Sequence, residues 1–264
     1  MDRFPLRSYL AVVTLLALTS PAGATALPDP PFSGGGFVAP SSDVLRQEEK
    51  VVGLLARYVK NRATCDWIAV TELQLAYTPA NPTKIDSSQA KWSTCVQKVD
   101  AYFDKGRDRL LERGLPACLD AAAIDALRTA STGLLASVSS AVYCDGDGAA
   151  PDPVVGLDIP DKKQETIGET SVAKILVKVW HNTGKCYSKA AKLALRTGGV
   201  LSSRDLEKIQ ACFDRVTDYA QDKIADLEQQ QKLPACLSTA TAEAAAGAVA
   251  SFAGSTTGDV YCQE

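Results

Sequence analysis

The sequence predicts an all-α protein: two tandem homologous disulfide-stapled helical bundles, of three to four helices each, after a cleaved signal peptide. Apolar residues recur at the three-to-four-residue steps of a helix, and no alternating strand pattern occurs. Motifs of the first half return in the second, and the cysteines are shared evenly between the halves. A composition of 46% hydrophobic and 22% charged residues is typical of a globular protein and excludes disordered or collagen-like chains.

Residues 1–26 have the pattern of a secretory signal peptide. Two arginines precede an apolar run of about ten residues, and an A-x-A sequence ends at Ala26. We expect the mature chain to start at Leu27, with cleavage after Ala24 as the alternative. The apolar run is far shorter than the ~20 residues that a membrane-spanning helix needs. We therefore expect a secreted or periplasmic protein with no transmembrane segment.

The cysteines are expected to form disulfides. Their number is even, and export places them in an oxidising compartment, where pairing is the default. Zinc is the competing interpretation, but no two cysteines have C-x-x-C spacing and His181 is the only histidine. We therefore expect no metal site. The cysteines are Cys65, Cys95, Cys118, Cys144, Cys186, Cys212, Cys236 and Cys262.

The chain is interpreted as a tandem duplication. The sequence Leu-Pro-Ala-Cys-Leu at 115–119 returns at 233–237, and Val-Tyr-Cys at 142–144 returns at 260–262. A repeat of this length indicates a duplicated domain rather than a short solenoid unit. Stretches rich in proline and glycine, which disfavour helix and strand interiors, supply the boundaries. The predicted segments are a signal peptide over 1–26, a Pro/Gly-rich linker over 27–42, helical repeat 1 over 43–144, an acidic Pro/Gly linker over 145–160, and helical repeat 2 over 161–264.

Three helical segments are predicted in each repeat. In the second repeat, apolar residues from Val172 to Leu193 follow the helical period. Ser203 is a candidate cap for the next helix, which we expect to run to about Gln231 before Pro234 breaks it. An alanine-rich third segment ends near Tyr261.

Two disulfides can be argued from the predicted hairpins. Cys186 and Cys212 lie at similar distances from a turn at 197–203, so antiparallel helices bring them together. Cys65 and Cys95 have the same relation to a turn at 78–85. We therefore prefer the pairs Cys65–Cys95 and Cys186–Cys212.

The remaining pairs, Cys118–Cys144 and Cys236–Cys262, conflict with a straight third helix. Such a helix would separate its ends by about 39 Å, beyond the reach of a disulfide. Either each third segment bends back near Gly133 or Gly254, which gives four helices in each bundle, or the connectivity differs.

The sequence offers little catalytic chemistry. Any triad would have to use His181, which stands among lysines in a helical segment and is interpreted as a surface residue. Paired cysteines cannot act as nucleophiles, and no haem, zinc-protease, nucleophile-elbow, phosphate-loop or dinucleotide motif is present. We expect no enzyme and no cofactor. A hydrolase that uses two carboxylates stays open, because its residues need no fixed spacing.

A row of basic residues marks the first helix of the second repeat. Its members step by three or four positions and so share one helix face, with no acidic residue between Glu169 and Asp205. Such a face suits an anionic surface or an acidic protein. We call this row the basic stripe: Lys174, Lys178, His181, Lys185, Lys189, Lys192 and Arg196.

A simpler interpretation of the basic stripe is intramolecular. The next helix carries an acidic row that could pair with the stripe across the hairpin, at Asp214, Asp218, Asp222 and Asp226. Each exposed pair would contribute only about 0.2–1 kcal/mol. The lysines could also be plain solvated surface. The sequence favours these interpretations over a ligand site.

From the sequence we predict an exported, non-enzymatic binding or structural module, which contacts an anionic surface or acidic partner through repeat 2. The alternative is a carrier of a small apolar ligand within a helical bundle, and a carboxylate-based hydrolase is third. A net charge of −3 argues against nucleic acid as a partner, and we expect a monomer.

Overall fold

The computed structural model describes residues 39–77, 81–144, 159 and 162–261. The predicted signal peptide lies outside these residues, as do most of the first predicted linker and nearly all of the second. The described part of the chain is all-helical and contains no strand. Its helices are α1 (Ser42–Tyr77), α2 (Pro82–Leu111), α3 (Ala121–Val142), α4 (Lys163–Arg196), α5 (Ser203–Gln229) and α6 (Thr239–Val260).

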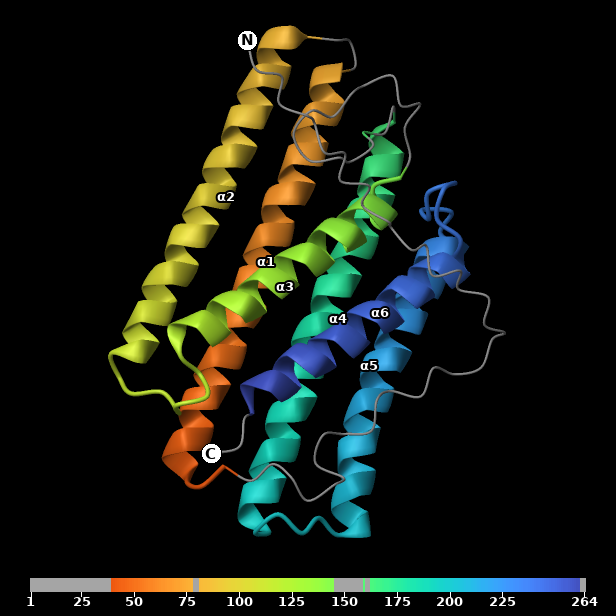
Figure 1. Cartoon of the computed structure of the whole chain (residues 1–264). Coiled ribbons are helices and arrows are strands. Elements are labelled where there is room, and N and C mark those ends of the chain that lie inside the picture. Colours follow the sequence, from red (N-terminus) through yellow and green to blue (C-terminus); the bar gives the residue numbers. More distant parts are fainter. Residues whose placement is uncertain (1–38, 78–80, 145–158, 160–161, 262–264) are drawn as a thin grey trace, which may run out of the picture.

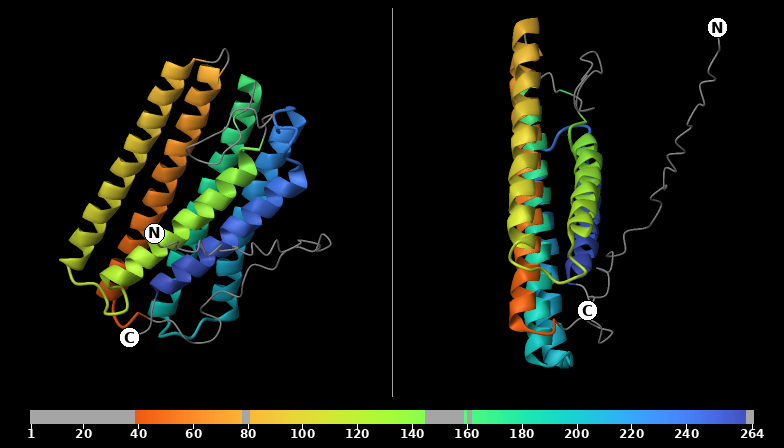
Figure 2. Two further views of the ribbon diagram at one scale, coloured as in Figure 1. Left: turned by 45° about the horizontal axis from the view of Figure 1, so that its top comes forward. Right: turned by 60° about the vertical axis from the view of Figure 1, so that its left-hand side comes forward.

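The helices form two layers (Figure 1). The long helices α2, α1, α4 and α5 lie side by side in that order, and α3 and α6 cross one face of this layer (Figure 2). Helix α4 packs against α1, α5 and α6, so it lies at the centre of the assembly. No helix in the described part of the chain is long and apolar enough to cross a membrane.

Short polar side chains begin four of the helices. Asn81, Asp120, Ser202 and Ser238 each accept a hydrogen bond from a backbone N–H of the first turn of α2, α3, α5 and α6. Such caps satisfy backbone donors that have no partner inside the helix. The predicted cap of α5 was one residue late, because Ser202 rather than Ser203 has the extended backbone of a cap.

Two disulfides each join two helices of the same half. Cys65 on α1 is bonded to Cys95 on α2, and Cys186 on α4 is bonded to Cys212 on α5. These are the two pairs that the hairpin argument preferred.

The expected pairs Cys118–Cys144 and Cys236–Cys262 are wrong, because Cys144 is bonded to Cys236. Cys118 is disulfide-bonded as well. The third segment of each half is one helix that does not bend back. Helices α3 and α6 lie side by side and run in opposite directions, so the end of α3 meets the start of α6 (Figure 1). The bond therefore links the two halves.

The described helices enclose two apolar clusters, and the larger one contains residues of both halves. It contains Leu45 and Val59 of α1, Leu135 of α3, Leu176 of α4 and Ile209 of α5, all of them buried. Three helices alone would leave the apolar sides of α1 and α4 open to water, and packing these two helices on each other removes that exposure. The described helices of the two halves thus pack directly against each other.

Candidate functional site

The basic stripe lies on the solvent side of α4. Residues between its members, such as Leu176, Val179 and Ala190, are buried in the core, as the helical period predicts. All seven members are exposed, namely Lys174, Lys178, His181, Lys185, Lys189, Lys192 and Arg196.

The stripe borders α1 rather than standing alone. Near one end of α4, the Lys192 ammonium lies 2.7 Å from the Glu49 carboxylate of α1. Toward the other end, the Lys174 ammonium lies 5.4 Å from the ring centroid of Trp67, also on α1. These two contacts show that α1 runs antiparallel along the stripe and supplies its neighbours.

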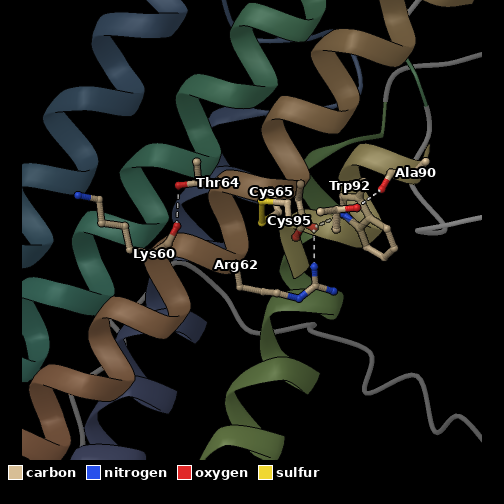
Figure 3. Close-up of a disulfide and its surroundings, with 9 residues drawn as sticks. Lys60, Arg62, Thr64, Cys65, Ala90, Trp92 and Cys95 are labelled. Atoms are coloured by element: carbon tan, nitrogen blue, oxygen red, sulfur yellow. Dashed lines mark hydrogen bonds and ion pairs between the residues drawn. A yellow bond between two sulfur atoms is a disulfide. The ribbon is translucent and has the colours of Figure 1, made fainter. Parts of the chain in front are cut away.

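Lys60 of α1 adds a further positive charge beside the stripe. Its side chain extends away from the Cys65–Cys95 disulfide (Figure 3) and is close enough to His181 to influence that imidazole. The pKa of His181 is lowered, first by partial burial and then by the positive charges of Lys185, Lys178 and Lys60. Burial and a local positive potential both lower the pKa of an imidazole, because each disfavours its charged form.

The predicted ion pairs between the stripe and the acidic row of α5 are not formed among the described residues. Asp226 instead pairs with Lys223 of its own helix at 2.6 Å, and Asp214 accepts a hydrogen bond from Gln210. Lys192 is the one stripe member with an ion pair in this part of the chain. The stripe therefore keeps most of its charge uncompensated.

A cavity of about 230 Å³ opens beside the stripe, between α1, α4 and α6. Small residues contribute to the space, because Gly53 and Ala56 on α1 and Gly184 on α4 all line it. A Cβ atom added to Gly53 would meet no atom within 4 Å, which shows how open this point is. The lining residues are Glu49, Val52, Gly53, Leu55, Ala56, Trp180, His181, Gly184, Lys185, Ser188, Thr256 and Thr257.

One side of the cavity is held by a hydrogen bond between helices. The hydroxyls of Ser188 and Tyr261 lie 2.7 Å apart. Burial, together with the negative charges of Glu49 and Glu48, raises the pKa of Tyr261 well above its usual range. Tyr261 is therefore a neutral hydrogen-bonding group at physiological pH, and it fixes the end of α6 against α4.

A buried carboxylate that the sequence analysis did not single out lies near the Cys65–Cys95 disulfide. Asp66 accepts hydrogen bonds from Trp92 Nε1 at 3.0 Å and from Ser139 Oγ at 3.3 Å, and pairs with Arg62. Arg62 and Trp92 come together beside the disulfide (Figure 3). Burial raises the pKa of Asp66, which Arg62 partly offsets. The network ties α1, α2 and α3 together, and none of these four residues lines the cavity beside the stripe.

A second buried acid, Glu169, stands next to the bond between the halves. Its Oε1 accepts the backbone N–H of Cys144 at 2.9 Å. The carboxylate lies close to both sulfurs of the Cys144–Cys236 bond, but two sulfurs bonded to each other are not thiolate ligands for a metal. Glu169 therefore serves to satisfy the backbone where α3 ends.

The described residues do not place two carboxylates at the cavity. Its one acidic lining residue is Glu49, which is already paired with Lys192. A hydrolase of the two-carboxylate kind needs a pair of acids on opposite sides of its substrate. This cavity therefore does not supply the pair of acids that the third alternative needs.

No protein-family model, curated protein or solved structure matches this chain. Two neighbouring features indicate its function: the basic stripe on α4 and the cavity beside the stripe.

Proposed function

We propose that this chain is an exported, non-enzymatic binding module whose basic stripe, together with Lys60, contacts an anionic surface or an acidic protein. The observation that carries the proposal is the row of exposed cations along α4 with little internal compensation. If each of these cations were paired with a neighbouring acidic side chain, internal ion pairs alone would explain the row. Here the nearest acidic row, on α5, makes its own local contacts.

The energetics suit a reversible electrostatic contact. Near an anionic membrane surface, each lysine contributes about 1 kcal/mol. Removing three of these charges should therefore weaken binding by about 3 kcal/mol, or roughly a hundredfold. Because exposed charges are screened by salt, the affinity should also fall as ionic strength rises.

The test is binding of the full mature chain to vesicles of phosphatidylcholine with and without phosphatidylglycerol, and to poly-glutamate as an acidic polypeptide. A charge-neutralised variant changes three exposed stripe lysines that have no ion pair in the described structure: Lys178→Gln, Lys185→Gln and Lys189→Gln. A matched control removes the same charge from three exposed, unpaired lysines of α2: Lys84→Gln, Lys98→Gln and Lys105→Gln.

We expect the stripe variant to lose binding and the α2 control to keep it. Binding to vesicles but not to poly-glutamate would identify a surface as the target, and the reverse would identify an acidic protein. Equal binding by both variants would overturn the proposal, because net charge alone would then explain the effect.

The cavity supports the second candidate, a carrier of a small ligand. Val52, Leu55 and Trp180 give it apolar walls. Pockets for drug-sized ligands measure about 300–1,000 Å³, so this cavity suits a smaller molecule. The test is native mass spectrometry of the exported protein, in which a co-purifying adduct supports this candidate.

A further inference from the structure

We infer that the cavity between α1, α4 and α6 is a binding site for a small organic carboxylate. The carboxylate would lie at Lys185 and His181, and its apolar body would lie between the helices. This inference rests on the second candidate function and gives its ligand a chemical class. It shares Lys185 and His181 with the basic stripe, but it does not require that the stripe contacts a large anionic partner.

Charge at the cavity favours an anion. Lys185 lines it and has no ion-pair partner in the described part of the chain. Lys60 of α1 adds positive potential near His181. The acidic lining residue Glu49 is held by Lys192 at 2.7 Å, so it does not neutralise Lys185.

The uncharged walls favour an organic body over a bare inorganic ion. Trp180 is 5% exposed, and its ring packs on Phe252 of α6 with 5.6 Å between ring centroids. This packing fixes one wall. Val52 and Ala56 on α1 supply apolar surface opposite. A ligand without apolar atoms would leave this apolar surface in contact with water, and its only favourable interaction would be the one with Lys185.

The number of charges limits the ligand to a monoanion. One uncompensated lysine lines the cavity, and its histidine is mostly neutral near neutral pH because its pKa is lowered. A ligand with several charges would bury some of them without a partner, which is costly. A single carboxylate matches a single ammonium and can also accept a hydrogen bond from the neutral imidazole.

The experiment measures binding of para-fluorobenzoate to the full mature chain by fluorine NMR. The neutral para-fluorobenzamide has nearly the same shape and serves as the uncharged comparison. For a ligand of this size we expect a dissociation constant of about 1 mM or below. The amide should bind at least roughly tenfold more weakly, since it lacks the charge that Lys185 meets.

Two variants distinguish the contribution of the cavity volume to binding from the contribution of the positive charge of Lys185. Gly53→Leu fills the cavity from α1 and leaves every charged residue in place, and Lys185→Met removes the charge but keeps an apolar stem. Each has a control remote from the cavity. Gly133→Leu adds the same side chain at an open point of α3, and Lys98→Met removes an exposed, unpaired lysine of α2.

We expect Gly53→Leu to abolish binding of the carboxylate and Lys185→Met to reduce it to the level of the amide, while both controls bind normally. Circular dichroism and thermal unfolding establish that each variant is folded. Gly53→Leu should still bind anionic vesicles, so failure of this inference is distinguishable from failure of the proposed function. No binding by the parent chain, or equal binding by the two variants and their controls, would overturn the inference.

Discussion

The Lys192 ammonium of α4 lies 2.7 Å from the Glu49 carboxylate of α1, and this pair joins the two halves of the chain at the edge of the cavity. It neutralises one member of the basic stripe and the single acidic residue that lines the cavity. The other described cations of the stripe keep their charge. Because the pair takes up only one stripe cation, this surface stays positive although the chain as a whole has a net charge of −3.

The first prediction concerns the imidazole of His181. Because it is the only histidine, its NMR signal can be followed through a pH titration without assignment. We expect its pKa below the usual value, and the variant Lys60→Met should raise it by removing a nearby positive charge. Lys98→Met, on another helix, should leave it unchanged. An unshifted pKa in Lys60→Met would show that α1 does not contribute to this surface.

The lowered pKa of His181 also determines the direction in which its contribution to stability changes with pH. In the window between the folded and unfolded pKa values of His181, the unfolded chain binds more protons than the folded chain. Protonation of His181 therefore favours the unfolded chain. The free energy of unfolding that depends on His181 is highest when the pH is above the unfolded pKa, and it decreases as the pH falls toward the folded pKa. The difference between the parent and His181→Gln in the pH dependence of urea unfolding measures this contribution of His181.

The second prediction concerns the disulfide between the halves. Cys144→Ser with Cys236→Ser opens a link across 92 residues, whereas Cys186→Ser with Cys212→Ser opens one across 26. In the chain-entropy description, the longer loop stabilises by about 1 kcal/mol more. Urea unfolding of both double variants measures the difference.

A peptide map without reductant checks the connectivity itself. It should recover peptides linked through Cys144 and Cys236. A link between Cys118 and Cys144 would contradict the packing of α3 against α6 described here.

The third prediction concerns the buried Asp66. Replacing it by alanine leaves the Trp92 N–H and the Arg62 guanidinium without their acceptor. A lost buried partner of this kind costs about 1–3 kcal/mol. Asp86→Ala, at an exposed position of α2, should change the free energy of unfolding by less than about 0.5 kcal/mol. Similar losses in both variants would show that the network contributes little.

The fourth prediction compares two helical glycines. A Cβ atom on Gly168 of α4 would overlap the carbonyl oxygen of Lys232, whereas one on Gly53 would meet open space. Gly168→Ala should therefore destabilise the protein by about 1–3 kcal/mol. Gly53→Ala should stabilise it by about 0.5–1 kcal/mol, because alanine suits a helix better. Thermal unfolding of both variants gives the two signs.

The local parts of this fold could be predicted from the sequence. The helical period gives the long segments and the exposure of the basic stripe. The symmetry of a helical hairpin gives the Cys65–Cys95 and Cys186–Cys212 bonds, because each depends on two neighbouring helices only.

The remaining features depend on contacts between helices far apart in the sequence. The Cys144–Cys236 bond follows from the way α3 lies along α6, which no local pattern encodes. The cavity requires Gly184 of α4 to lie close to Val52 of α1 and to Thr257 of α6. The partner of Lys192 is on α1, although the acidic row of α5 is nearer in the sequence.

The proposed function requires that the stripe on α4 binds anions because most of its positive charge is uncompensated. The most direct measurement is the affinity of the full mature chain for phosphatidylglycerol-containing vesicles as a function of salt concentration, for the parent and for the triple glutamine variants of α4 and α2. We expect an affinity that falls steeply with salt for the parent and the α2 variant, and a weak, nearly salt-independent affinity for the α4 variant. Indistinguishable salt dependence in all three proteins would contradict it.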